Sequence, residues 1–313
     1  MKKTTLFFSL LVLLISSIAF ARPPAEVLEL IEKTYDPTIT VQRQDKKSTG
    51  VSCITQETVL STKDPVTGKQ RTVDVKMYEP RYNRDPHAPK RGIVLIPPIM
   101  GENIIDRLYA AYFCENQIHV LIVQQWQNGH LPTVELKTQD EQALRAISAI
   151  RNGVQYMRSQ NVEKVGLFGT SLGAIMAIPV LNLEADIKAA VLIVGGVNLP
   201  HIMAYSEQKE VARIRSERVR KYGFPNAQEY ENRLREEIKL EPFDFLNLNG
   251  SKDVFVVTAL RDTSVPTIDQ KLMIDTLQGN IEVKAYEKDH VPTVLATYRA
   301  DRDQFKEWFK KAL

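Results

Sequence analysis

The chain has 313 residues, of which 43% are hydrophobic, and it carries a formal charge of +3 at pH 7. This composition allows a full-sized hydrophobic core, and it excludes a disordered chain or an array of repeats. The near-balanced charge gives no field strong enough to indicate a nucleic acid as a partner.

The first 21 residues have the pattern of a secretory signal peptide. Residues 1–21 begin with two lysines, continue with an apolar run from Leu6 and end on Ala-Phe-Ala. The small residues suit cleavage after Ala21, and the run is short for a membrane span. We therefore expect export to a bacterial periplasm or beyond, with no stable membrane anchor after cleavage. A retained anchor is the alternative.

The chain has two cysteines, Cys53 and Cys114. An oxidising compartment would allow them to form a disulfide. Two buried, unpaired thiols are the alternative, and the spacing does not decide between them.

Residues 22–90 are expected to form an N-terminal extension with a hairpin at the edge of a sheet. Segments 50–62 and 71–80 are β-branched and alternate in polarity, and a turn containing Asp64, Pro65 and Gly68 separates them. Two such runs joined by a turn predict paired antiparallel strands.

From residue 91 onward, apolar strands alternate with segments of helical periodicity. The expected strands are 92–98, 119–126, 164–169, 189–196, 253–260 and 281–286. This alternation predicts an α/β fold whose mostly parallel sheet has helices on both faces. The core would comprise residues 91–196 and 246–313, and the charged segment 197–245 would be an insertion without a strand. Pro179 is expected to end or kink its helix.

Residues 169–173 read Gly-Thr-Ser-Leu-Gly between an apolar strand and an apolar helix. A G-x-S-x-G sequence at such a sharp turn exposes the serine hydroxyl, here Ser171, as a nucleophile. The Leu172 N–H would lie at the helix N-terminus, where its partial charge suits an oxyanion. A glycine-rich turn that only tightens helix–sheet packing is the alternative.

A serine nucleophile needs a base, and the position of each histidine along the expected sheet separates the candidates. His290 follows the last strand, at the carboxyl edge where reactive groups collect in such sheets. His130 also follows a strand and is a competitor. His119 opens a strand at the opposite edge, His201 lies in the charged insertion and His87 lies in a proline-rich connection.

The base needs a carboxylate to orient its ring. Asp262 follows the penultimate strand at the carboxyl edge, whereas Asp253 begins that strand and Asp269 lies in a helix. Asp289 is adjacent to His290 and can hardly orient its neighbour's ring. An aspartate that only caps a turn or helix is the alternative role for Asp262.

The order Ser171, Asp262, His290 resembles that of the α/β-hydrolase superfamily, from about Arg91 to the C-terminus. The matching motifs are GTSLG, RDTSVP and DHVP. The resemblance implies a helical lid at 197–245 and acyl transfer to water. One departure is the loop LIPPIMGEN, where relatives usually carry His-Gly. Its prolines lack N–H groups, so the second oxyanion donor would be Ile99, with Met100 as the alternative.

These observations predict an exported serine hydrolase, most simply a carboxylesterase that cleaves a small or medium acyl ester. A peptidase or amidase with the same triad, and a non-catalytic binding protein with the same fold, are the alternatives. The expected partner is a small-molecule ester or amide, and no metal or nucleotide cofactor is expected because the usual motifs are missing from the sequence. Met203, Tyr205 and Trp126 are candidates for an acyl pocket, although core packing is the simpler role for each. The oligomeric state cannot be read from the sequence.

Overall fold

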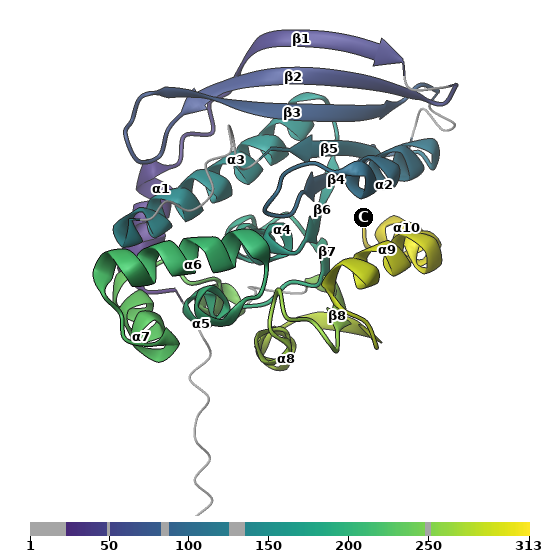
Figure 1. The fold of residues 1–313 in the computed structure, drawn as a ribbon. Helices are drawn as coiled ribbons and strands as arrows, with labels where there is room; N and C mark the ends of the chain where they lie inside the picture. Colours follow the sequence, from purple (N-terminus) through teal and green to yellow (C-terminus); the bar gives the residue numbers. More distant parts are fainter. Residues whose placement is uncertain (1–22, 49–50, 83–87, 125–134, 248–251) are drawn as a thin grey trace, which may run out of the picture.

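The computed structural model describes residues 23–48, 51–82, 88–124, 135–247 and 252–313 (Figure 1). The expected signal peptide and the candidates His87, Trp126 and His130 lie outside these ranges. Among the helices of these ranges, none is long and apolar enough to cross a membrane.

Nine described strands form one sheet in the order β1-β2-β3-β5-β4-β6-β7-β8-β9. The strands are β1 (Thr40–Ser48), β2 (Cys53–Lys63), β3 (Gln70–Pro80), β4 (Arg91–Ile96), β5 (His119–Val123), β6 (Lys164–Thr170), β7 (Ala189–Ile193), β8 (Asp253–Ala259) and β9 (Asn280–Tyr286). The helices are α1 (Ala25–Thr34), α2 (Ile104–Glu115), η1 (Leu136–Thr138), α3 (Gln139–Ser159), α4 (Leu172–Leu183), α5 (Leu199–Tyr205), α6 (Lys209–Tyr222), α7 (Ala227–Glu237), η2 (Pro242–Phe245), α8 (Thr267–Thr276), α9 (His290–Ala300) and α10 (Arg302–Ala312).

The six strands from β5 to β9 in this order are parallel, which confirms the α/β class predicted from the sequence. Alternate residues of β4 enter two different apolar layers, Val94 and Ile96 on one face and Ile93 and Leu95 on the other. Helices α1, α3 and α4 cover the first face, and α2, α9 and α10 cover the second (Figure 1). Both faces are therefore dry, which explains the continuous apolar runs in these strands.

The predicted hairpin is present, because β2 and β3 pair antiparallel along their whole length. Its turn forms where Asp64 Oδ1 accepts the N–H groups of Val66 and Thr67 at 3.0 and 2.8 Å. Strand β1 was not predicted. It pairs with β2 at the sheet edge, and its polar sequence lacks the alternation that marks a half-buried strand.

A disulfide joins Cys53 at the start of β2 to Cys114 in α2, with a Cα–Cα distance of 6.2 Å. The bond ties the antiparallel extension to a helix of the parallel core. For a separation of 61 residues, the loss of chain entropy in the unfolded state corresponds to about 4 kcal/mol of stabilisation.

Helices α5, α6 and α7 occupy the segment between β7 and β8 that we expected to form a lid. Most of α6 is solvated, and among its described residues Ile214 and Arg218 are buried. The expectation that Pro179 ends its helix is wrong, because α4 continues through it to Leu183. Every residue of α4 from Gly173 to Asn182 is buried, so packing outweighs the local cost of about 3 kcal/mol for an interior proline.

Candidate active site

Ser171 lies in the sharp turn between β6 and α4, with φ 56° and ψ −121°. A positive φ is strained for a residue with a side chain, and such strain persists only where the surroundings enforce it. The Ser171 N–H donates to the Ile193 carbonyl oxygen at 2.8 Å, which fixes the turn against β7.

The two glycines of the motif are required by close backbone approach. A Cβ on Gly173 would overlap the Ile96 carbonyl oxygen and lie 2.6 Å from the Pro97 carbonyl oxygen. A Cβ on Gly169 would lie 2.6 Å from the Ala174 Cα. The N-terminus of α4 is thus pressed against the loop that follows β4, which is the contact an oxyanion site between these two segments needs.

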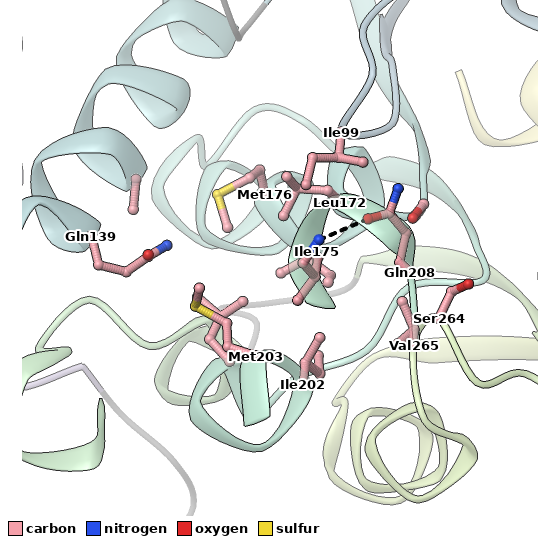
Figure 2. A pocket seen from close by; sticks show the side chains of 14 residues that line it. Ile99, Gln139, Leu172, Ile175, Met176, Ile202, Met203, Gln208, Ser264 and Val265 are labelled. Carbon is pink, nitrogen blue, oxygen red and sulfur yellow. Dashed lines mark hydrogen bonds between the residues drawn. The ribbon is translucent and has the colours of Figure 1, made fainter. Parts of the chain in front are cut away.

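Ser171 opens into an apolar pocket with about 670 Å³ of empty space, its open mouth included. Figure 2 shows Ile175 and Met176 of α4 on one side of the pocket and Ile202 and Met203 of α5 on the other. The Ser171 side chain remains partly reachable, since the residue is 9% exposed. A reactive hydroxyl at the mouth of an apolar cavity suits a substrate with an apolar group beside its reacting bond.

The two predicted oxyanion donors lie at this same mouth. Leu172 is the first residue of α4, and the side chains of Leu172 and Ile99 face the pocket next to each other (Figure 2). No described residue is recorded as accepting a hydrogen bond from the N–H of Leu172 or of Ile99. Both groups are therefore available to a developing negative charge.

The loop that carries Ile99 is anchored where α2 begins. Asn103 caps this helix by accepting from Ile105 and Asp106 N–H groups, and Asp106 Oδ2 accepts from the Asn103 N–H at 2.9 Å. Burial of the Asp106 carboxyl raises its pKa to about 7, and the nearby Glu102 adds to this effect. The capping box thus depends on a carboxyl group whose charge is costly.

His290 and Asp262 are joined as the sequence predicted, with 2.6 Å between His290 Nδ1 and Asp262 Oδ2. Asp262 follows β8 and His290 opens α9 after β9; these strands are parallel neighbours, so their carboxyl ends meet at one edge. Ser171 follows β6 at this same edge. Since a carboxylate only accepts, Nδ1 carries the ring proton and Nε2 keeps the lone pair that a general base needs.

The other described histidines have different partners. His201 Nδ1 lies 2.8 Å from Asp269 Oδ2, a second His–Asp pair that joins α5 to α8. Burial raises the pKa of the Asp269 carboxyl to about 6. His119 lies at the amino edge of the sheet, and burial lowers its pKa. Tyr205 stacks on the His201 ring, whereas Met203 lines the pocket as anticipated.

Sequence reasoning missed most residues of the lid side of the pocket. Leu199, Ile202, Gln208 and Val211 line it, and Gln208 Oε1 also accepts the Val211 N–H at 3.0 Å, shown as the dashed line in Figure 2. The apolar spacing of Leu199, Ile202 and Met203 is a helical signal, but nothing in the sequence says which surface that helix faces.

The titratable residues of the described ranges include no group of three or more histidine, cysteine or acidic side chains that could hold a metal ion. The chemistry available at the pocket is therefore that of a hydroxyl, an imidazole–carboxylate pair and backbone N–H groups.

The sequence matches no family model and no curated protein sequence, but solved structures resemble the fold. An acetyl xylan esterase from Paenibacillus sp. R4 matches with a TM-score of 0.68 and 13% identity, over 96% of this chain and 99% of that one. Acetyl xylan esterase 1 from Thermoanaerobacterium sp. JW/SL YS485 matches with a TM-score of 0.62 and 15% identity, over 93% and 95% of the two chains.

The α/β hydrolase GrgF from Penicillium sp. sh18 also matches, with a TM-score of 0.54 and 13% identity over 82% of this chain and 98% of that one. At these identities the likeness establishes the fold alone. The chain has the α/β-hydrolase fold, as its three motifs indicated.

Proposed function

We propose that the protein is an exported serine carboxylesterase that cleaves a small or medium acyl ester through an acyl-serine intermediate. One observation carries the proposal. Ser171, held at φ 56°, opens into an apolar pocket at the sheet edge where His290 is hydrogen-bonded to Asp262. The acetyl xylan esterases among the structural neighbours support ester hydrolysis as the chemistry of this fold.

In the proposed reaction, His290 Nε2 takes the hydroxyl proton as Ser171 Oγ attacks the ester carbonyl carbon. Asp262 keeps the ring oriented and stabilises its positive charge. The N–H groups of Leu172 and Ile99 would bind the oxyanion of the tetrahedral intermediate. The protonated ring then gives its proton to the leaving alkoxide. Water, activated by the same ring, releases the acid and restores the serine.

The pocket supports an acyl group longer than acetyl. Ile175, Met176, Ile202 and Met203 extend the apolar wall beyond the space that one methyl group would fill. Each methylene buried there would contribute about 0.8 kcal/mol, or roughly fourfold in kcat/KM, until the pocket is full. A series of p-nitrophenyl esters should therefore rise in kcat/KM with acyl length and then fall. The same screen with amide substrates tests the peptidase and amidase alternatives.

A fluorophosphonate probe tests whether the site is catalytic. Wild-type protein should be labelled and should hydrolyse the esters, and Ser171→Ala should do neither. Full esterase activity in Ser171→Ala would overturn the assignment, and so would a wild type that neither labels nor turns over. A large loss from His130→Ala with none from His290→Ala would transfer the base to His130.

Export is the part of the proposal that depends on the N-terminal pattern. The Cys53–Cys114 disulfide supports it, because such bonds persist in oxidising compartments. Full-length chain expressed in a bacterium should be recovered outside the cytoplasm with Arg22 as its first residue. Uncleaved protein confined to the cytoplasm would contradict export and leave the esterase proposal intact.

A further inference from the structure

Gln270 is a fully buried side chain of α8 that binds the Asp262 carboxylate. Its Nε2 donates to Asp262 Oδ2 and to the Val265 carbonyl oxygen, both at 2.8 Å. Its Oε1 accepts from the Thr258 hydroxyl at 2.7 Å and from the Ala259 N–H at 3.1 Å. Both N–H groups and both lone pairs of the amide are thus used.

The surroundings allow this amide only one orientation. The Ala259 N–H can only donate, so the amide atom facing it must be the oxygen. The nitrogen then faces a carboxylate and a backbone carbonyl, which can only accept. A turned amide would set donor against donor and acceptor against acceptor in a site closed to water, at a cost of several kcal/mol. Gln270 is therefore a fixed donor to Asp262.

The Asp262 carboxylate receives four hydrogen bonds, two on each oxygen. Oδ1 accepts from the N–H groups of Ser264 and Val265 at 2.8 and 3.0 Å. Oδ2 accepts from Gln270 and from His290 Nδ1. The first pair comes from the turn around Asp262 itself, whereas the Gln270 bond comes from a separate element and acts on the oxygen that holds the histidine ring.

We propose that Gln270 is a positioning residue, whose amide holds the Asp262 carboxylate in the rotation that presents Oδ2 to His290. The inference rests on the proposed hydrolase function. Gln270 does not line the substrate pocket and acts only through Asp262. A side chain that orients a reacting group needs support of this kind, because a misplacement of about 1 Å can cost a factor of 100 in rate.

The first test replaces the amide by a thioether of similar size. Gln270→Met should lower kcat by about 10- to 100-fold and leave KM within about twofold, since the pocket is untouched. Gln142→Met is the matched control, because Gln142 is a buried helix glutamine whose Oε1 has no hydrogen-bond partner in the described structure. The control should keep wild-type kcat. A folded Gln270→Met with wild-type kcat would overturn the inference.

A second test separates positioning from packing by its pH dependence. In Gln270→Glu a carboxyl group faces Asp262, and two adjacent carboxyls hold one proton between them. While that proton is held, the new group can donate to Oδ2 and activity should be retained. Activity should then decline as the pH rises and the proton is lost, a decline that the wild type lacks. A profile parallel to that of the wild type would contradict positioning by Gln270.

Thr258→Val provides a milder change that keeps the glutamine and the local volume. It removes one donor to Gln270 Oε1 and should lower kcat about two- to fivefold, so this test remains if Gln270→Met fails to fold. Unchanged turnover would count against the inference. Fluorophosphonate labelling separates the two proposals: an unlabelled wild type overturns the hydrolase function, whereas a labelled wild type with equally fast Gln270→Met overturns only the role of Gln270.

Discussion

Gly173→Ala tests whether the contact between α4 and the loop after β4 builds the oxyanion site. The new Cβ would overlap the Ile96 carbonyl oxygen and lie 2.6 Å from that of Pro97, where an ordinary contact begins at 3.4 Å. Both neighbours are backbone atoms, so no side chain can rotate away. The loop must move by at least about 0.8 Å at Pro97, and the nearby Ile99 N–H would move with it.

We expect two measurable effects of Gly173→Ala. Overpacking of this kind costs about 1–3 kcal/mol, which in a chain of this size lowers Tm by several degrees. Loss of one oxyanion donor lowers kcat by about 10²–10³-fold, while the acyl pocket and KM change little. Thermal unfolding by circular dichroism and kinetics on a p-nitrophenyl ester measure the two effects.

The matched control is Gly223→Ala at the end of α6. Gly223 has φ +69° and no atom within 4 Å of a new Cβ, so it should cost about 1 kcal/mol of backbone strain and no activity. Gly173→Ala with wild-type Tm and kcat would refute the packing argument. A fall in Tm with unchanged kcat would show that the loop after β4 supplies no oxyanion donor.

Three further outcomes follow from the structure. His290→Ala should lower turnover by at least about 10³-fold, whereas His201→Ala should stay within about threefold of wild type; the reverse order would assign the base to His201. Cys114→Ser should lower the free energy of unfolding in urea by about 2–4 kcal/mol, and added reductant should destabilise the wild type but not the variant. Because burial raises the folded-state pKa of Asp106 from 3.8 to about 7, its stabilising contribution should be complete below pH 4 and should fall by on the order of 3 kcal/mol by pH 7. Asp106→Asn should remove that dependence, and equal slopes of unfolding free energy against pH would contradict it.

The sequence predicted the parts of the fold that depend on apolar periodicity. All six expected core strands are present, and so are the hairpin and the helices between them. Strand β1 escaped detection because an edge strand buries little and needs no apolar alternation. Pro179 misled because local propensity does not include the packing that encloses α4.

The candidate site was predictable where a residue's position along a strand places it at one edge of the sheet. Asp262 and His290 both follow the carboxyl ends of parallel strands, so topology alone brought them together. Gln270 carries no such signal, since its role depends on which face of α8 turns toward Asp262. The lid residues Ile202 and Gln208 depend in the same way on how separate helices pack.

Strand β1 has a consequence for how the protein behaves at high concentration. Its outward edge bears exposed polar side chains such as Arg43 and Asp45, which discourage another chain from adding itself to the sheet. Beneath it lies β2, a long and largely buried strand. A truncation that removed β1 would uncover β2 as a template for intermolecular pairing, so the polar border is a safeguard against aggregation.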